Sequence, residues 1–176
     1  MVKFDERAIL DNGAYIYAMR QEIEAIADAV CEKGFDNILF TASGGSLAMM
    51  QPFDYMISVM SGLDVRSQVS AELLGIGNNR LTDRTLVFMA SKSGDTKETV
   101  EAAGYVKEKG AAIISVLGVE GSPLGGLSDY TVVYKDGRPQ EFVLYMLVGR
   151  ILHNKGYFDD YVQFADELKN LPAALV

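Results

Sequence analysis

Apolar positions along this chain switch between helical spacing and short unbroken runs. Over residues 15–32 they recur every three or four positions, which predicts an amphipathic helix that stops at Gly34. Further along, short apolar runs have the length of strands, and stretches with helical spacing separate or follow them. The predicted strands are residues 37–41, 63–69, 85–90, 112–117 and 130–134, and the predicted helices after the first are residues 47–60, 97–109 and 139–152.

The order of these elements indicates the fold class. Strands that alternate with helices through short connections are typical of a parallel sheet with helices on both faces. The run at residues 85–90 carries no charge, as expected of a strand buried on both sides. We therefore predict an α/β fold, a three-layer sandwich whose five-stranded parallel sheet has flavodoxin-like order. Pro52 must lie near the start of its predicted helix or kink it, and Ser122 and Pro123 lie in a predicted loop.

Two apolar segments do not fit a self-contained domain. Residues 142–148 are apolar around the whole circumference of their helix, so that helix needs a second layer or a partner chain to cover it. Residues 157–176 have the pattern of a mildly amphipathic helix with an apolar ending. We therefore expect a chain that was cut from a longer one and that self-associates, as a dimer with a two-fold axis.

Composition narrows the choice of partner and compartment. The 176 residues are 49% hydrophobic, as in one ordinary globular domain, and 16 basic against 24 acidic side chains give a net charge of −8. That charge disfavours binding to a nucleic-acid backbone. Cys31 has no second cysteine to pair with, which fits a reducing compartment. Residues 1–10 lack a long apolar run, and no stretch has the ~20 apolar residues of a membrane span. We expect a cytoplasmic protein without membrane or nucleic-acid partners.

Two polar loops follow predicted strands and carry the candidate chemistry. Residues 43–46 (Ser-Gly-Gly-Ser) follow the first strand, and residues 91–96 (Ser-Lys-Ser-Gly-Asp-Thr) follow the third. Glycine lets backbone amides approach an anion, and the start of a helix favours a phosphate. Serine and threonine before a helix are also common N-caps, which is the simpler interpretation of either loop alone. Neither loop is a P-loop or a dinucleotide-binding motif, which argues against a nucleotide ligand.

These loops give the chain a family resemblance. Residues 42–46, 91–99 and 122–124 (Ser-Pro-Leu) resemble the SIS (sugar isomerase) domain, and the likeness covers about residues 35–153. The resemblance implies a phosphosugar-binding fold without a cofactor or metal ion. Lys92 and Gly45 differ from the glutamine and threonine of the glucosamine-6-phosphate synthase pattern, which argues against an aminotransfer substrate. The residues implied to bind the phosphosugar are Gly44, Gly45, Ser46, Ser91, Lys92, Ser93 and Thr96.

The order of segments is similar to the first half of tandem-SIS proteins, above all the fructosamine-6-phosphate deglycases, with the isomerase half of glucosamine-6-phosphate synthase as a relative. This implies an N-terminal helical segment (residues 1–34), a SIS domain (35–155) and a C-terminal helix (156–176) leading to a second SIS half. The implied parent reaction cleaves a 6-phosphofructosamine to glucose 6-phosphate and an amine. In such proteins the catalytic glutamate and histidine come mainly from the second half. This chain alone is therefore expected to bind a sugar 6-phosphate or 6-phosphofructosamine but to turn it over poorly.

The catalytic acid and base are not assigned by the sequence. Glu141, at the start of the last predicted helix, is a candidate, although a carboxylate there would also stabilise the helix N-terminus. Glu72 is interpreted as a solvated surface residue, and His153, at the end of the same helix as Glu141, as a packing residue. Cys31 is interpreted as a core thiol.

Two other functions remain open at this point. The first is a noncatalytic SIS domain that senses a phosphosugar. A sensor that acts through DNA binding needs a basic helix-turn-helix, and this chain has none. The second is a flavodoxin-like electron carrier, which fits the predicted strand order alone.

Overall fold

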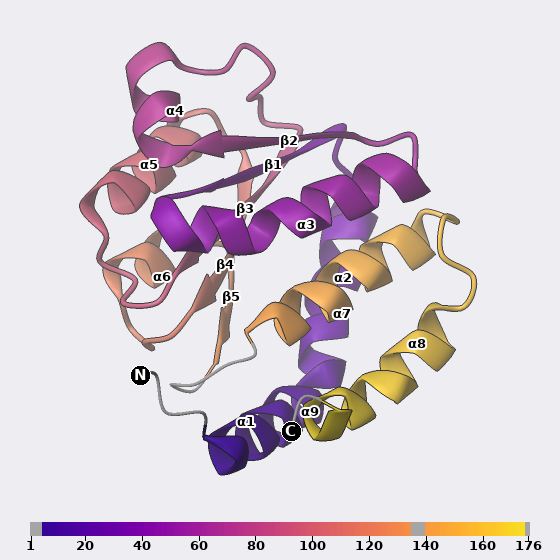
Figure 1. Cartoon of the computed structure of the whole chain (residues 1–176). Helices are drawn as coiled ribbons and strands as arrows, with labels where there is room; N and C mark the ends of the chain where they lie inside the picture. Colours follow the sequence, from indigo (N-terminus) through magenta and orange to yellow (C-terminus); the bar gives the residue numbers. More distant parts are fainter. Residues whose placement is uncertain (1–4, 135–139, 175–176) are drawn as a thin grey trace.

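The computed structural model, which describes residues 5–134 and 140–174, has a five-stranded parallel sheet at its centre (Figure 1). The strand order is β2-β1-β3-β4-β5, so the predicted flavodoxin-like order is confirmed. The three central strands are almost completely buried because helices cover both faces of the sheet. The strands are β1 (Asn37–Ala42), β2 (Asp64–Val69), β3 (Thr85–Ser91), β4 (Ala112–Leu117) and β5 (Tyr130–Val133).

The helices divide between the two faces of the sheet (Figure 1). On one face, α2 (Arg20–Lys33), α3 (Gly44–Met60) and α7 (Glu141–Asn154) pack on alternate residues of the strands, such as Phe40 and Phe88. On the other face, α4 (Ser70–Ile76), α5 (Lys97–Glu108) and α6 (Pro123–Leu127) pack on the residues between them. The two hydrophobic cores therefore lie on opposite sides of one sheet, as the period-2 side-chain pattern of a strand requires.

The contacts of helix α7 explain why it is apolar around its whole circumference. It lies against α2 and α3 and also contacts α1 (Glu6–Ala18) and α8 (Tyr161–Glu167). Nine of its residues, from Phe142 to Leu152, are buried within this chain. The second layer that the sequence required is therefore supplied by the chain's own terminal segments, and α7 needs no partner chain to cover it.

Several predicted boundaries differ from the structure. The single helix predicted over residues 15–32 is part of two helices that meet at Met19, because α1 turns towards the C-terminal segment, where Pro172 packs against Gly13. The predicted C-terminal helix is three short pieces: α8, a 3-10 turn (Leu168–Asn170) and α9 (Leu171–Ala174). Helices α4 and α6 were not predicted, because elements of seven and five residues are too short to show helical periodicity.

Two remaining expectations concern α3 and α7. Helix α3 continues through Pro52, which lies on its exposed side, where the carbonyl left without a helical partner can be hydrated. Helix α7 begins at Glu141, and the predicted start at Pro139 lies outside the described residues.

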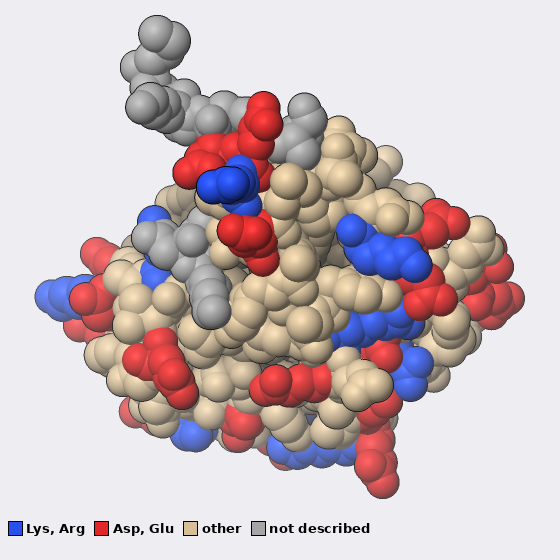
Figure 2. Space-filling view, turned by 90° about the horizontal axis from the view of Figure 1, so that it is seen from below, with Lys and Arg blue, Asp and Glu red and all other residues tan. Residues whose placement is uncertain are grey.

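Two observations bear on the expectation that the chain has neither a nucleic-acid nor a membrane partner. Seen from below, Lys and Arg side chains lie among Asp and Glu side chains and form no continuous basic patch among the described residues of this face (Figure 2). In the described part of the chain, no helix has both the length and the apolar character needed to cross a bilayer.

Candidate functional site

The two predicted loops meet where the strand order reverses. β1 and β3 are neighbours in the sheet, and their pairing runs in register up to Thr41 and Met89. After β1 the chain enters α3 on one face of the sheet, and after β3 it enters α5 on the other face. In open parallel sheets, this divergence of successive connections creates the crevice in which ligands bind. The structure thus brings both loops to the topological switch point.

The first loop presents the start of α3 to solvent. Ser43 is extended (φ −111°, ψ 142°), and Gly44 adopts a positive φ of 54° as the first residue of the helix. Gly44 and Gly45 are exposed, and a Cβ built on either would have no atom within 4 Å. No side chain caps the helix. The amides of the first turn therefore face open space that could hold an anion.

The second loop is organised around the buried hydroxyl of Ser91. This oxygen accepts a hydrogen bond from the Gly94 amide at 2.9 Å and lies 3.1 Å from the Thr96 hydroxyl oxygen. Thr96 occupies the N-cap position of α5, but its side chain does not cap the helix. The simple N-cap interpretation therefore fails for this residue. Lys92 and Ser93 are exposed at the tip of the loop, so the Ser91–Thr96 pair shapes the turn that presents them.

A third loop, which follows β4, packs tightly against the second. Gly94 has a φ of +71°, and a Cβ there would lie 2.1 Å from the Ser122 hydroxyl oxygen. The Leu124 amide donates to the Gly94 carbonyl at 2.9 Å. A Cβ on Gly118 would lie 2.4 Å from the Lys92 carbonyl oxygen. Sequence reasoning named Gly94 only as part of the second loop and did not mention Gly118, because only the folded loops show how closely their backbones approach.

Ser122 is itself unusual in this contact. Its hydroxyl oxygen is buried and has no hydrogen-bond partner among the described residues. The sequence analysis named Ser122 only as part of the Ser-Pro-Leu motif at residues 122–124.

A direct hydrogen bond joins the first loop to the helix that follows the second. The hydroxyl oxygens of Ser43 and Thr99 lie 3.2 Å apart, and Thr99 is only 1% exposed. Sequence reasoning did not assign a role to either hydroxyl, although both residues lie in the motifs that resemble a family. The signal that was available is the position of Thr99, three residues after Thr96 in the first turn of α5.

Among the described residues, no hydrogen bond joins the acid–base candidates to the first or second loop. Glu141 is half-buried in the first turn of α7, and in the described part of the chain it makes no hydrogen bond to either loop. Glu72 is exposed and lines a polar hollow of about 570 Å³ outside the edge strand β2, together with Asp54 and Ser67. Among the described residues, no group of three or more His, Cys, Asp or Glu side chains could hold a metal ion.

His153 and Cys31 have structural surroundings. His153 Nδ1 lies 2.9 Å from the Phe158 carbonyl oxygen, and its ring lies 5.7 Å from the ring of Tyr161. This agrees with a packing role at the end of α7, away from the carboxyl ends of the strands. Cys31 is half-buried, and burial raises the pKa of its thiol.

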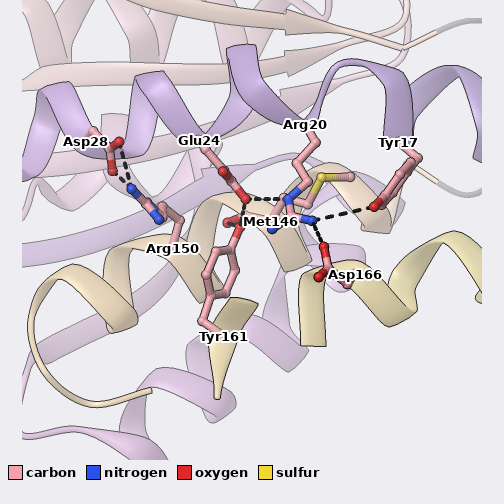
Figure 3. Close-up of polar contacts among 8 residues, drawn as sticks. All are labelled: Tyr17, Arg20, Glu24, Asp28, Met146, Arg150, Tyr161 and Asp166. Atoms are coloured by element: carbon pink, nitrogen blue, oxygen red, sulfur yellow. Dashed lines mark hydrogen bonds and ion pairs between the residues drawn. The ribbon is translucent and has the colours of Figure 1, made fainter. Parts of the chain in front are cut away.

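Charged side chains gather instead between α2, α7 and α8 (Figure 3). The carboxylate of Glu24 accepts hydrogen bonds from Arg20 Nε at 2.6 Å and from the Tyr161 hydroxyl at 2.9 Å. Burial raises the pKa of Tyr161, and the hydrogen bond to Glu24 raises it further. We call this group the α2–α7–α8 cluster; its members are Arg20, Glu24, Asp28, Arg150, Tyr161 and Asp166.

The second half of the cluster is a bidentate ion pair. Arg150 donates from Nε and Nη2 to the two carboxylate oxygens of Asp28 at 2.7 and 3.0 Å. This hydrogen bonding lowers the pKa of Asp28 and raises that of Arg150. The charged groups of the cluster are thus paired with one another, which is the pattern of a structural network rather than of a binding site.

Comparison with known proteins adds family evidence. The family model of the SIS domain matches residues 34–152, more than half of the chain. The chain is 30% identical over 161 residues to the fructosamine deglycase FrlB of Bacillus subtilis, a match that covers 86% of this chain and 49% of the relative. It is 28% identical over 155 residues to a glutamine–fructose-6-phosphate aminotransferase of Thermotoga maritima, covering 81% of this chain and 25% of that protein.

Solved structures share the fold. A Bacillus subtilis protein named as a candidate phosphosugar isomerase superposes with a TM-score of 0.81 at 29% identity, covering 87% of this chain and 49% of that one. The Vibrio vulnificus NanR protein, solved in complex with ManNAc-6P, superposes with a TM-score of 0.73 at 20% identity, covering 92% of this chain and 66% of that one. The chain spans about half the length of the first of these relatives.

Proposed function

This chain belongs to the SIS domain family, and we propose that it binds a sugar phosphate between its first and second loops. The observation that carries the proposal is the Ser43–Thr99 hydrogen bond of 3.2 Å, which joins the uncapped starts of α3 and α5 at the topological switch point. Two helix N-termini that converge on one crevice favour a doubly negative group.

The proposed contacts divide between backbone and side chains. At the first loop, the amides of Gly44 and Gly45 and the hydroxyl of Ser46 bind phosphate oxygens. At the second loop, exposed Ser93 and Lys92 supply a hydroxyl and a positive charge. Ser91 and Thr96 complete the set, and their mutual hydrogen bond holds the turn in shape. A binding set made mainly of amides and hydroxyls suits a phosphate while leaving the sugar free for chemistry at its other end.

We propose further that the chain is the first SIS half of a phosphosugar isomerase or deglycase, within the division 1–34, 35–155 and 156–176. Similarity to the fructosamine deglycase FrlB supports a 6-phosphofructosamine as substrate. In that reaction a base removes a proton from C1, and reprotonation at C2 gives an imine at C1. Water then hydrolyses the imine, which yields glucose 6-phosphate and the free amine. Glu141 is the residue of this chain proposed to take part as acid or base.

The binding proposal is tested with a variant that should not harm the fold. Gly45→Asp adds a carboxylate where nothing lies within 4 Å, at a helix start that an acidic side chain stabilises. We expect fructose 6-phosphate or glucose 6-phosphate to raise the melting temperature of the wild type but not of Gly45→Asp. Gly104→Asp, in α5, is the matched control and should keep the shift, because space is also open there. A full shift in Gly45→Asp, or none in the wild type, contradicts the proposal.

Turnover distinguishes the deglycase from the alternative. We expect the isolated chain to bind a 6-phosphofructosamine but to release little amine. A noncatalytic sensor would bind the phosphosugar and would still release no amine when extended by a second SIS half. Membership of the SIS family argues against the flavodoxin-like carrier.

We also propose that the chain forms a homodimer. The apolar faces of α2 and α7 are covered within the chain, so the support comes from elsewhere. Tyr55 and Val59 on α3 are 72% and 65% exposed. A mainly apolar hollow of about 590 Å³ lies next to α7, lined by Tyr145 and Phe164 among others. Apolar surface of this kind favours association, and sedimentation of a monomer at micromolar concentration would contradict it.

A further inference from the structure

The Ser43–Thr99 hydrogen bond joins parts of the molecule that otherwise separate. The pairing of β1 with β3 ends at Thr41 and Met89, so the residues beyond them no longer pair with each other, although β1 pairs with β2 up to Ala42 and β3 with β4 up to Ser91. α3 and α5 then pack on opposite faces of the sheet. The spacing of the two loops therefore depends on contacts made after the ladder ends.

The two hydroxyls are committed to this contact rather than to capping. Ser43 precedes α3 at its N-cap position, yet its side chain makes no cap hydrogen bond. Thr99 is almost completely buried, with 1% of its surface exposed, so its hydroxyl has little access to water. A buried hydroxyl without a partner is costly, so this pairing favours the observed spacing over a wider one.

We propose that Ser43 and Thr99 form a positioning pair that sets the separation of the two loops and thereby the affinity for the phosphosugar. The pair acts through Gly44–Ser46 and residues 91–96, and Thr99 itself does not touch the ligand. This inference rests on the proposed function, since it assumes that both loops bind one phosphate group. It gives a role to a hydroxyl that is buried beside the first loop.

The test is a double-mutant cycle on fructose 6-phosphate binding, measured by calorimetry. Thr99→Val removes the hydroxyl at nearly constant volume, and we expect the dissociation constant to rise about threefold to tenfold, the range for one lost hydrogen bond. Thr99→Ser keeps the hydroxyl and should bind within twofold of the wild type. Ser43→Ala should weaken binding like Thr99→Val, and the double variant should be no weaker than either single variant.

A matched control separates positioning from general loss of stability. Thr85 is equally buried at the other end of β3, and its hydroxyl donates to the Arg80 carbonyl at 3.1 Å. Thr85→Val should lower the free energy of unfolding but leave the dissociation constant unchanged. Wild-type affinity in Thr99→Val, additive effects in the double variant, or equal weakening in Thr85→Val would each overturn the positioning pair.

A ligand-free measurement keeps this inference separate from the proposed function. If the wild type binds no sugar phosphate, the proposed function fails. The positioning pair is then judged by amide hydrogen exchange at Gly94, whose buried amide donates to the Ser91 hydroxyl at 2.9 Å. We expect faster exchange there in Thr99→Val than in Thr85→Val at matched global stability, and equal rates would refute the pair.

Discussion

The crevice at the ends of β1 and β3 and the α2–α7–α8 cluster are both rich in polar groups, but they use them differently. In the cluster, Arg20 pairs with Glu24 and Asp166, and Arg150 pairs with Asp28. Every charge of the cluster therefore has a partner within it. At the crevice, the first-turn amides of α3 face open space at two glycines. Polar groups that are paired internally hold a fold together, whereas amides that are accessible and uncapped are available to a ligand.

The two regions also differ in the residues that shape them. Tyr161 fills a notch at Gly149, where an added Cβ would lie 2.9 Å from its ring. The crevice is shaped instead by backbone turns at positive φ, such as Gly94. The comparison teaches that damage to the cluster should cost stability alone, whereas damage to the crevice should cost binding as well.

The largest expected effect is in the cluster. Tyr161→Ala removes a completely buried aromatic side chain, so we expect a loss of about 3–5 kcal/mol in the free energy of unfolding, measured by urea titration. Tyr161→Phe removes only the hydroxyl and should cost about 1–2 kcal/mol. Affinity for fructose 6-phosphate should not change in the folded protein. A weaker affinity in Tyr161→Phe would show that the cluster and the crevice are coupled.

A smaller loss of stability, now with loss of binding, is expected at the crevice. Gly94→Ala places a Cβ 2.1 Å from the Ser122 hydroxyl oxygen at a left-handed backbone position. We expect a cost of about 2–4 kcal/mol from overpacking and backbone strain together, and loss of the ligand-induced melting shift. Adding Ser122→Gly removes the clashing atoms and should restore part of the stability. If the double variant is no more stable than Gly94→Ala, the Ser122 contact is not the cause.

The smallest effect concerns the ion pair of the cluster. Hydrogen bonding to Arg150 lowers the pKa of Asp28 in the folded protein, so the pair stabilises the fold above the unfolded pKa of about 3.9. This contribution is lost as the pH falls below that value through the folded pKa. Because Asp28 is partly exposed, we expect it to be less than about 1 kcal/mol. Asp28→Asn should make the stability of the protein less dependent on pH below the unfolded pKa of about 3.9.

The predicted sheet and its order were confirmed because strand periodicity and short connections are local properties of the sequence. The charge-free run at residues 85–90 became the central strand β3, and the loops after β1 and β3 were located at the correct strand ends. Short elements were missed, since α4 and α6 have too few residues for a periodic signal.

The sequence by itself determined which segments alternate, which loops are rich in glycine and hydroxyls, and that the apolar helix at residues 142–148 had to be covered. Only the tertiary structure decided what covers that helix, that Ser43 meets Thr99, and that Gly94 must be glycine because Ser122 lies against it. The physical reason is range: hydrophobic period and turn chemistry act over a few residues, whereas these contacts join residues that only the folded sheet brings together.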